Sequence, residues 1–278
     1  YITSHVIKLD KNHLYISQTN INIGAFTMKI AVISDIHGNM EALNAVMSDI
    51  RQKECERIFV LGDYAMAGPE PDSAIEYFMK RKDNPKYSMI QGNTDLMIAD
   101  YTEQLYDTLK TKAPVMAAAL KMDVKIINPF EKEFLKNLPI QLQVEEEGVK
   151  FLLVHGSPRK NNEDILPETP LSEVEKMLKN VEADVVLCGH THIPCGFQTN
   201  TKKTVVNAGS VGRTFFKNSD NIPRACYLII NVNNGSCVFE HQFVNYDNER
   251  AAQKVKDREF YGSEKLANTL LNPELRHF

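Results

Sequence analysis

The chain has 278 residues, of which 43% are hydrophobic and 24% are charged, with 13 Gly and 12 Pro. This composition excludes collagen-like, low-complexity and wholly disordered proteins, and the length suits one large domain or two small ones. Lys and Arg (32) against Asp and Glu (36) give a net charge of −4, so the chain has no general attraction to nucleic acid or to an anionic membrane. No apolar run in the sequence approaches the roughly 18 residues that a membrane-spanning helix needs.

The cysteines indicate the redox environment. There are five of them, widely spaced, and an odd number at such spacing is unlike a disulfide framework. The first residues also lack the charged-then-apolar pattern of a secretory leader. We therefore expect a reducing, cytoplasmic location.

Residues 1–27 differ from the rest of the chain, because they are rich in Ile, Asn and Thr and contain one glycine. Met28 then opens a strong strand pattern. In the interpretation that we favour slightly, residues 1–27 are an N-terminal extension that is not native, and Met28 is the natural start. In the other, they form a strand-forming arm, since residues 6–9 and 14–17 could pair. We place no function there, and we expect residues 28–278 to form one domain.

After Met28, short apolar runs alternate with helical periodicity. The expected strands are 29–34, 57–61, 87–90, 150–154, 184–188, 204–207, 225–231 and 236–244. Asn39 is a plausible N-cap for a helix whose apolar positions 43, 46, 47 and 50 form one stripe. Ser172 and Glu175 form a capping-box pattern for a later helix. This order predicts a parallel sheet with right-handed crossovers, finished by antiparallel strands after about residue 200.

Residues 94–140 interrupt the strand–helix rhythm and predict two or three helices. Leu105 and Leu109 mark the first, and Pro114 opens the second. The third follows Asn128 as N-cap and Pro129 at the first helical position. An all-helical insert of this kind is either a lid over a site or extra packing on one flank, and the sequence does not choose between them.

Five of the expected strands end in short polar motifs. The motifs are Asp35-Ile36-His37-Gly38-Asn39, Gly62-Asp63, Gly92-Asn93-Thr94-Asp95, His155-Gly156-Ser157 and Gly189-His190-Thr191-His192. Because the carboxyl ends of strands in an α/β sheet converge on one crevice, we expect these side chains to meet in space. We also expect Asp-x-His and His-x-His to place two side chains on the same side of an extended segment, since side chains alternate there with a period of two.

The types of these residues indicate a metal site. Two carboxylates, four imidazoles and one amide oxygen form a mixed donor set, which suits Mn, Fe, Zn, Co or Ni better than Ca or Mg. Seven donors are too many for one tetrahedral ion and suit two ions. Each motif alone has an ordinary explanation, since Gly-Asp after a strand is usually a turn and a lone histidine is usually no ligand. Their joint occurrence favours metal binding.

The ordered motifs resemble the calcineurin-like metallophosphoesterase superfamily and span most of residues 28–192. Three further segments resemble a bacterial and archaeal subgroup of small cytosolic phosphoesterases; they are Gly68-Pro-x-Pro-Asp72, Pro158-Arg159 and Asn207-Ala-Gly-Ser-Val-Gly212. The resemblance implies an α/β fold, a four-layer α/β/β/α sandwich with two mixed sheets flanked by helices.

The resemblance also implies a function. The chain would be a two-metal phosphoesterase that hydrolyses phosphomonoesters, phosphodiesters or phosphoanhydrides through a hydroxide bridging the ions. The substrate would be a phosphorylated small molecule or nucleotide, a dinucleoside polyphosphate or a phosphoprotein. Two divalent ions would be bound, with Mn²⁺ expected first and Fe, Zn, Co or Ni as alternatives. By this resemblance the first ion is held by Asp35, His37 and His192, the second by Asn93, His155 and His190, and both by Asp63.

One position departs from the family pattern. Many members have a histidine after Gly-Asn that helps to protonate the leaving oxygen, and Thr94 stands there in this chain. A threonine hydroxyl is no general acid near pH 7, so we expect a preference for good leaving groups such as aryl phosphoesters. Asp95 is the nearest candidate for a substitute acid, and its alternative interpretation is a carboxylate favoured at a helix start by the helix dipole.

Other candidates are less specific. Arg159 and Arg213 follow motif turns and could fork onto substrate phosphates, or could form ion pairs. Asn39 is a further candidate substrate contact. The rival function is a catalytically weak metal-binding scaffold on the same fold, as in the small subunit of the retromer coat, which also lacks the third-motif histidine. A nuclease is disfavoured by the negative net charge. The sequence gives no indication of the oligomeric state.

Overall fold

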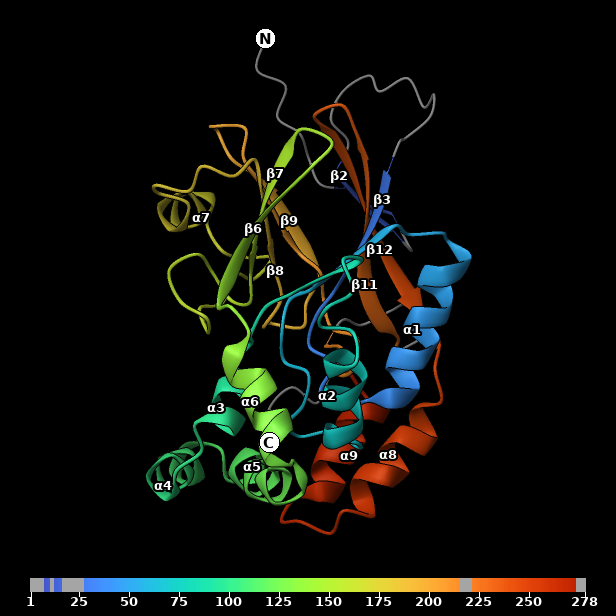
Figure 1. The fold of residues 1–278 in the computed structure, drawn as a ribbon, viewed down its shortest axis with the longest axis vertical. Helices are drawn as coiled ribbons and strands as arrows, with labels where there is room; N and C mark the ends of the chain where they lie inside the picture. Colours follow the sequence, from blue (N-terminus) through green and yellow to red (C-terminus); the bar gives the residue numbers. More distant parts are fainter. Residues whose placement is uncertain (1–7, 11–12, 17–27, 216–221, 274–278) are drawn as a thin grey trace.

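The computed structural model describes residues 8–10, 13–16, 28–215 and 222–273, and it shows two β-sheets that face each other (Figure 1). The first sheet has the strand order β1-β2-β12-β11-β3-β4-β5. Its strands are β1 (Lys8–Asp10), β2 (His13–Ile16), β12 (Ser236–Val244), β11 (Ala225–Asn233), β3 (Met28–Ile33), β4 (Arg57–Val60) and β5 (Tyr87–Met89). The second sheet has the order β6-β7-β8-β10-β9. Its strands are β6 (Gln141–Glu146), β7 (Val149–Val154), β8 (Val185–Cys188), β10 (Thr204–Asn207) and β9 (Cys195–Gln198).

Helices cover the outer faces of the two sheets. Their bounds are α1 (Met40–Gln52), α2 (Pro71–Met79), α3 (Asn93–Ala99), α4 (Glu103–Lys112), α5 (Pro114–Ile126), α6 (Pro129–Asn137), α7 (Leu171–Met177), α8 (Asn248–Lys256) and α9 (Ser263–Leu271). Figure 1 shows α1 outside the first sheet and α7 outside the second. The layers are therefore α/β/β/α, as the resemblance implied. Among the described residues, we find no helix of the length and apolarity that crossing a membrane demands.

The strand directions follow from the alternation of strands and helices. β3, β4 and β5 pair in parallel, and so do β7, β8 and β10. β11 pairs antiparallel with both β3 and β12, so the late antiparallel strands are confirmed. The antiparallel strands β6 and β9 were not among the expected strands. β6 carries only two apolar residues between charged and amide ones, and β9 is four residues long and contains a glycine, so neither gives a strong strand pattern.

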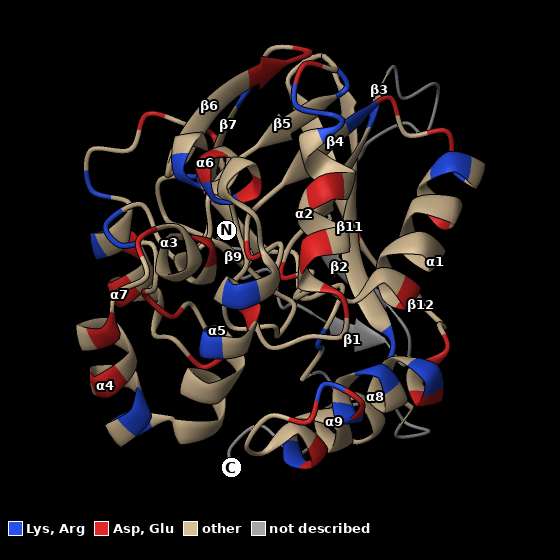
Figure 2. Cartoon of the chain, turned by 60° about the horizontal axis from the view of Figure 1, so that its bottom comes forward, with Lys and Arg blue, Asp and Glu red and all other residues tan. Residues whose placement is uncertain are grey.

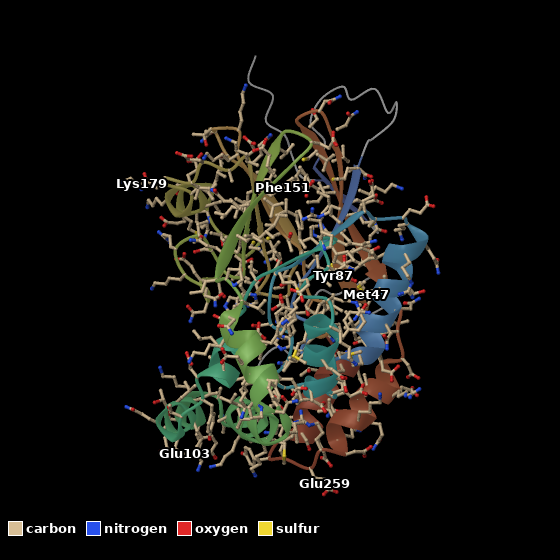
Figure 3. The ribbon with its side chains drawn as sticks, viewed as in Figure 1. Met47, Tyr87, Glu103, Phe151, Lys179 and Glu259 are labelled. Atoms are coloured by element: carbon tan, nitrogen blue, oxygen red, sulfur yellow. The ribbon has the colours of Figure 1, made fainter. Side chains whose placement is uncertain are left out.

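Side-chain alternation along the strands separates the core into layers. In β3, Ile30 and Val32 pack between the sheets, whereas Ala31 and Ile33 face the helices. Phe59 of β4 meets Phe151 of β7 edge-on across the gap between the sheets, with ring centroids 5.9 Å apart. Such a pair adds about 0.5–1.5 kcal/mol beyond its buried area. Figure 3 shows Phe151 among the interior side chains, while Lys179 and Glu259 lie at the periphery.

The predicted N-cap of α1 is confirmed. The side chain of Asn39 accepts a hydrogen bond from the backbone N–H of Ala42 at 3.1 Å, which satisfies a donor that the first turn leaves free. The predicted stripe is buried along its whole length; its members are Leu43, Val46, Met47 and Ile50. Asn128 caps α6 in the same way, with Glu131 completing a capping box.

The predicted capping box of α7 is wrong. The helix begins at Leu171, with Pro170 at the N-cap position, so Ser172 lies within the first turn. Glu175 accepts instead from the backbone N–H of Asn200 at 2.9 Å. A tertiary contact therefore takes the side chain that the local pattern assigned to the cap.

The pairing that the less favoured interpretation of residues 1–27 offered is present in the part that is described. β1 and β2 pair antiparallel, and β2 pairs with β12, so the two strands extend the edge of the first sheet. Val6, Ile7 and Ser17, which also belong to the expected pairing, lie outside the described residues.

Four helices, α3 to α6, occupy the segment where two or three were expected. α6 packs against α2 and α3, and α5 packs against α4 and α9. Figure 1 shows these helices together with α2, α8 and α9 at one end of the two sheets. Figure 2 shows acidic and basic residues interspersed on α8 and α9 of this helical end.

Candidate metal centre

The five polar motifs lie where the sequence placed them, directly after β3, β4, β5, β7 and β8. Backbone hydrogen bonds hold neighbouring motifs together. The N–H groups of Ile36 and His37 both donate to the carbonyl of Asp63, at 2.8 and 3.0 Å, and the N–H of Gly189 donates to the carbonyl of His155 at 2.8 Å. The N–H of His190, after β8, donates to Asp35 Oδ2, after β3, at 3.0 Å, so the loops of the two sheets meet at one common edge.

At five of the seven candidate ligands the backbone is left-handed. The φ angles are 54° at Asp35, 47° at His37, 56° at Asp63, 67° at His190 and 61° at His192. The expectation of extended Asp-x-His and His-x-His segments is therefore wrong, and the side chains converge because the loops turn. Left-handed φ costs free energy at non-glycine residues and occurs preferentially at functional sites.

Five of the seven candidate ligands converge in two overlapping groups. Asp35, His37 and His192 form one group, and Asp35, Asp63 and His155 form the other; in each, the ligand atoms lie within 4.8 Å of one another. Asp35 Oδ1 lies 3.3 Å from His192 Nε2, and Asp63 Oδ2 lies 3.4 Å from His155 Nε2. All five side chains are buried.

The hydrogen bonds of the three histidines define which ring nitrogen faces the site. The Nδ1 atoms of His37, His155 and His192 contact the backbone carbonyls of Met66 at 2.9 Å, Leu61 at 2.7 Å and Arg213 at 2.6 Å. Because a carbonyl only accepts, each Nδ1 carries the proton and donates. In the neutral ring the Nε2 lone pair then points at the carboxylates, which is the arrangement of metal-binding histidines.

Two further observations fit a cation between these groups. Asp35 Oδ1 is buried and has no hydrogen-bond partner among the described residues. His37 Nε2 and His192 Nε2 lie 3.1 Å apart, so two electron-rich nitrogens face each other. Buried polar atoms are almost always satisfied, and a divalent ion would satisfy all three. The residues present therefore fit the mixed nitrogen and oxygen shell of a transition-metal ion.

The pKa values show how strongly these groups interact. Burial would raise the pKa of Asp35, but the surrounding His192 and His155 hold it well below its ordinary value. Asp63 is likewise lowered to a pKa of about 2, because His155 outweighs its burial. Burial would lower the pKa of His155, but the two carboxylates raise it to about 10. Burial and His192 lower the pKa of His37 to about 4.

The third motif fixes the position of Asp63. The backbone N–H of Thr94 donates to Asp63 Oδ1 at 2.9 Å, which leaves Oδ2 facing His155 and His37. A Cβ at Gly92 would lie 2.0 Å from Asp63 Oδ1, so only glycine lets the carboxylate lie against this loop. The Thr94 hydroxyl donates to the backbone carbonyl of Ala65 at 3.3 Å, so its proton is directed at this carbonyl.

Asp95 is fully buried and contacts the backbone. Its Oδ2 accepts from the N–H groups of Asp63 and Gly92, both at 2.8 Å, and its Oδ1 accepts from Tyr64 at 2.9 Å. Burial and the Asp63 carboxylate raise its pKa to about 7. These contacts match the helix-start interpretation. Both carboxylate oxygens accept from backbone N–H groups, so neither is directed at the position of a leaving group.

Asn93 and His190 lie beside the second group. Asn93 Oδ1 is 3.0 Å from His155 Nε2, which places its amide oxygen at the site. The His190 ring packs edge-on against His155, with centroids 5.3 Å apart, but its Nε2 faces Asp164 Oδ1 at 3.3 Å. Burial and His155 lower the pKa of His190. Asp164 was not identified from the sequence, because a single Asp in a polar loop carries no distinctive pattern.

Of the three candidate substrate contacts, one is exposed and two are buried. Arg159 forms a fork with Glu163 at an exposed position, so its charge is already matched. Arg213 is buried, and its Nε donates to Thr269 of α9 at 3.1 Å. Asn39 is also buried, and its amide donates to the carbonyl of Gly212 at 2.8 Å while its oxygen caps α1. The Arg213 charge also acts on the candidate ligand His37, whose pKa it helps to lower.

Sequence reasoning also missed the groups that orient the ligands. The carbonyls that fix the histidine rings belong to the backbone and have no signature in the sequence. Phe215 stacks on the His192 ring, with centroids 4.9 Å apart and an interplanar angle of 11°. In the sequence, Phe215 follows Gly212 of the last glycine-containing motif by three residues, and this nearness is the signal that could have indicated a place at the site.

Comparison with known proteins agrees with this geometry. A family model described as the calcineurin-like phosphoesterase superfamily domain matches residues 28–235. The chain belongs to this superfamily. That membership places it, at the level of the family, among the phosphoester hydrolases that bind metal ions.

Relatives extend over most of the chain. An uncharacterised protein of Methanocaldococcus jannaschii is 29% identical over 242 residues, which cover 81% of this chain and 91% of that protein. A metallophosphoesterase from Sphaerobacter thermophilus has a TM-score of 0.68 at 23% identity and covers 87% of this chain and 98% of its own. A hypothetical protein from Pyrococcus horikoshii has a TM-score of 0.77 at 23% identity, with coverage of 89% and 99%. The two structures show that the fold is shared.

Proposed function

We propose that the protein is a two-metal phosphoesterase that hydrolyses phosphomonoester, phosphodiester or phosphoanhydride bonds. The observation that carries this proposal is the convergence of three imidazole Nε2 atoms and two carboxylates, one of which has an oxygen without a hydrogen-bond partner among the described residues. In this proposal Asp35, His37 and His192 hold one ion, Asn93, His155 and His190 hold the second, and Asp63 contacts both. The position of Asp63 Oδ2, 3.7 Å from His37 Nε2 and 3.4 Å from His155 Nε2, supports its bridging role.

When bound, two divalent ions supply Lewis-acid chemistry, since they polarise phosphoryl oxygens and lower the pKa of water. The chain's own contribution is orientation. Backbone carbonyls direct three imidazole Nε2 atoms inward, and the third motif holds Asp63 against its glycine. Thr94 supplies no group that could protonate a leaving oxygen near pH 7. The arrangement therefore suits substrates whose leaving group needs no proton.

The proposal includes Mn²⁺ as the working ion, because the donor set mixes nitrogen and oxygen. It also includes a phosphorylated small molecule or nucleotide as substrate and a cytoplasmic location. All five cysteines are free and buried, which supports a reducing compartment. We propose residues 28–278 as the catalytic domain, with 1–27 as an N-terminal extension.

The experiment measures Mn²⁺ binding and Mn²⁺-dependent hydrolysis of bis-p-nitrophenyl phosphate by the whole chain. Asp63→Asn keeps the shape of the side chain and removes the charge between His37 and His155, so we expect kcat/KM to fall about 100-fold or more. Asp107→Asn, the same change at an exposed position of α4, is the matched control and should act like wild type.

Two outcomes would contradict the proposal. A wild-type chain that binds no Mn²⁺ would remove the metal centre altogether. A chain that binds two ions and hydrolyses neither phosphodiesters, phosphomonoesters nor phosphoanhydrides would instead support the scaffold alternative.

A further inference from the structure

The loop between β4 and α2 contacts the candidate ligand His37 at two points. The Met66 carbonyl accepts the hydrogen bond that orients the His37 ring. Two residues further on, Gly68 lies so close to His37 that a Cβ there would be 1.5 Å from the His37 carbonyl oxygen. The position of His37 Nε2 therefore depends on where residues 66–68 lie.

This segment does not hold its conformation by itself. Met66 and Ala67 have φ angles of 75° and 60°, which are left-handed and unfavourable for residues with a Cβ. Such residues keep this backbone only where the surroundings over-determine it. The loop therefore needs contacts from outside its own sequence.

Those contacts come from a buried ion pair in the helical end of the molecule. Asp123 of α5 is fully buried, and its Oδ2 accepts from the backbone N–H of Ala67 at 3.0 Å. Arg258, which follows α8, donates through Nη1 to the carbonyl of Gly68 at 2.6 Å and through Nη2 to Asp123 Oδ1. Burial raises the pKa of Asp123 to about 6 and Arg258 opposes that rise, so the carboxylate is ionised at neutral pH.

We propose that Asp123 and Arg258 are positioning residues that clamp residues 66–68 and thereby set the metal affinity of the centre at His37. The inference rests on the proposed metal centre. It adds a dependence of that centre on two segments that carry none of its ligands, the insert helix α5 and the segment after α8. Arg258 also lies beyond residues 28–235, the part of the chain that the family model covers.

The clamp is tested by the affinity for Mn²⁺, measured by calorimetry on the whole chain, and by the absorption spectrum of the Co²⁺-loaded protein. Asp123→Asn removes the charge that holds Arg258 and leaves one oxygen to serve two donors. We expect one of the two Mn²⁺ sites to weaken about 10-fold or more, as for other groups that orient metal ligands. We also expect the Co²⁺ spectrum to change, because the orientation of the His37 ring alters the ligand field.

Two variants separate positioning from general destabilisation. Asp49→Asn removes a carboxylate that accepts from the Tyr227 hydroxyl at 2.7 Å on α1, away from the loop, and should lower stability while leaving Mn²⁺ affinity unchanged. Arg258→Lys keeps the buried charge pair and loses the fork, so it is the milder variant should Asp123→Asn fail to fold. It should weaken the same Mn²⁺ site by a smaller factor.

The outcomes are distinct from those of the proposed function. Wild-type protein that binds Mn²⁺, together with a folded Asp123→Asn or Arg258→Lys protein of wild-type affinity and spectrum, would overturn the clamp alone. Wild-type protein that binds no ion would overturn the proposed function and the clamp with it. Equal loss of affinity in Asp49→Asn would also overturn the clamp, because global stability would then explain the effect.

Discussion

Replacement of Asp95 by Asn tests the idea that one buried carboxylate holds two site loops together. The wild-type carboxylate accepts three backbone N–H groups, from Asp63, Tyr64 and Gly92. Asn has one oxygen, which can take the place of Oδ2 and keep two of these bonds. Its amide nitrogen then faces the N–H of Tyr64, which loses its acceptor.

The magnitude follows from counting donors. A buried N–H left without an acceptor costs about 1–3 kcal/mol. Removal of the charge also relieves repulsion from Asp63. We therefore expect Asp95→Asn to lower the free energy of unfolding by about 1 kcal/mol, the lower end of that range. Asp95→Ala loses all three bonds and should cost about 3 kcal/mol or more. Since the loops carry Asp63 and Asn93, Mn²⁺ affinity should fall about 10-fold already in the Asn variant.

Urea unfolding at pH 7 measures the stabilities, and calorimetry measures Mn²⁺ affinity. Asp247→Asn is the matched control, because Asp247 caps α8 with a single bond to Arg250 at an exposed position, where Asn caps equally well. An equal loss of unfolding free energy in the Asn and Ala variants would refute the reasoning from the number of N–H groups left without an acceptor. Unchanged Mn²⁺ affinity in a destabilised Asn variant would refute the link from Asp95 to the ligands.

Two further predictions concern pH and substrate choice. Burial lowers the pKa of His241 from 6.5 to about 4, so the folded chain binds fewer protons than the unfolded chain between these values. Protonation of His241 should therefore account for a loss of about 3 kcal/mol in the free energy of unfolding as the pH drops from 6.5 to 4, and urea titrations of His241→Gln, which cannot titrate, should lack that part of the loss. With Thr94 in place of a general acid, kcat/KM should be about 100-fold or more higher for p-nitrophenyl than for alkyl phosphoesters; equal rates would show that another group donates the proton.

Much of the architecture was accessible from the sequence, because it depends on short-range patterns. The apolar runs that became β3, β4, β7 and β8 are buried on both faces, and such strands read as continuous hydrophobic segments. Polar residues directly after these strands had to meet at one edge once the strands were parallel. That topology brings the loops of Asp35, Asp63 and His155 to the same end of the molecule, and the turns within the loops then direct the side chains at one another.

The remaining features depend on contacts between distant segments. Asp35 and His37 belong to a left-handed turn, which no alternation of side chains encodes. Arg159 had the right neighbours for a phosphate contact, but Glu163 four residues later competes for its guanidinium. Asp123 and Arg258 are 135 residues apart, and nothing in either local pattern indicates the other.

The left-handed turns at the ligands bear on attempts to build such a centre elsewhere. A designer who copied the seven side chains onto regular strands would reproduce the chemistry of the donors and lose their directions. The transferable unit is the set of three left-handed turns, after β3, β4 and β8, with their carbonyl acceptors and glycine contacts, and a successful graft would have to carry that backbone along.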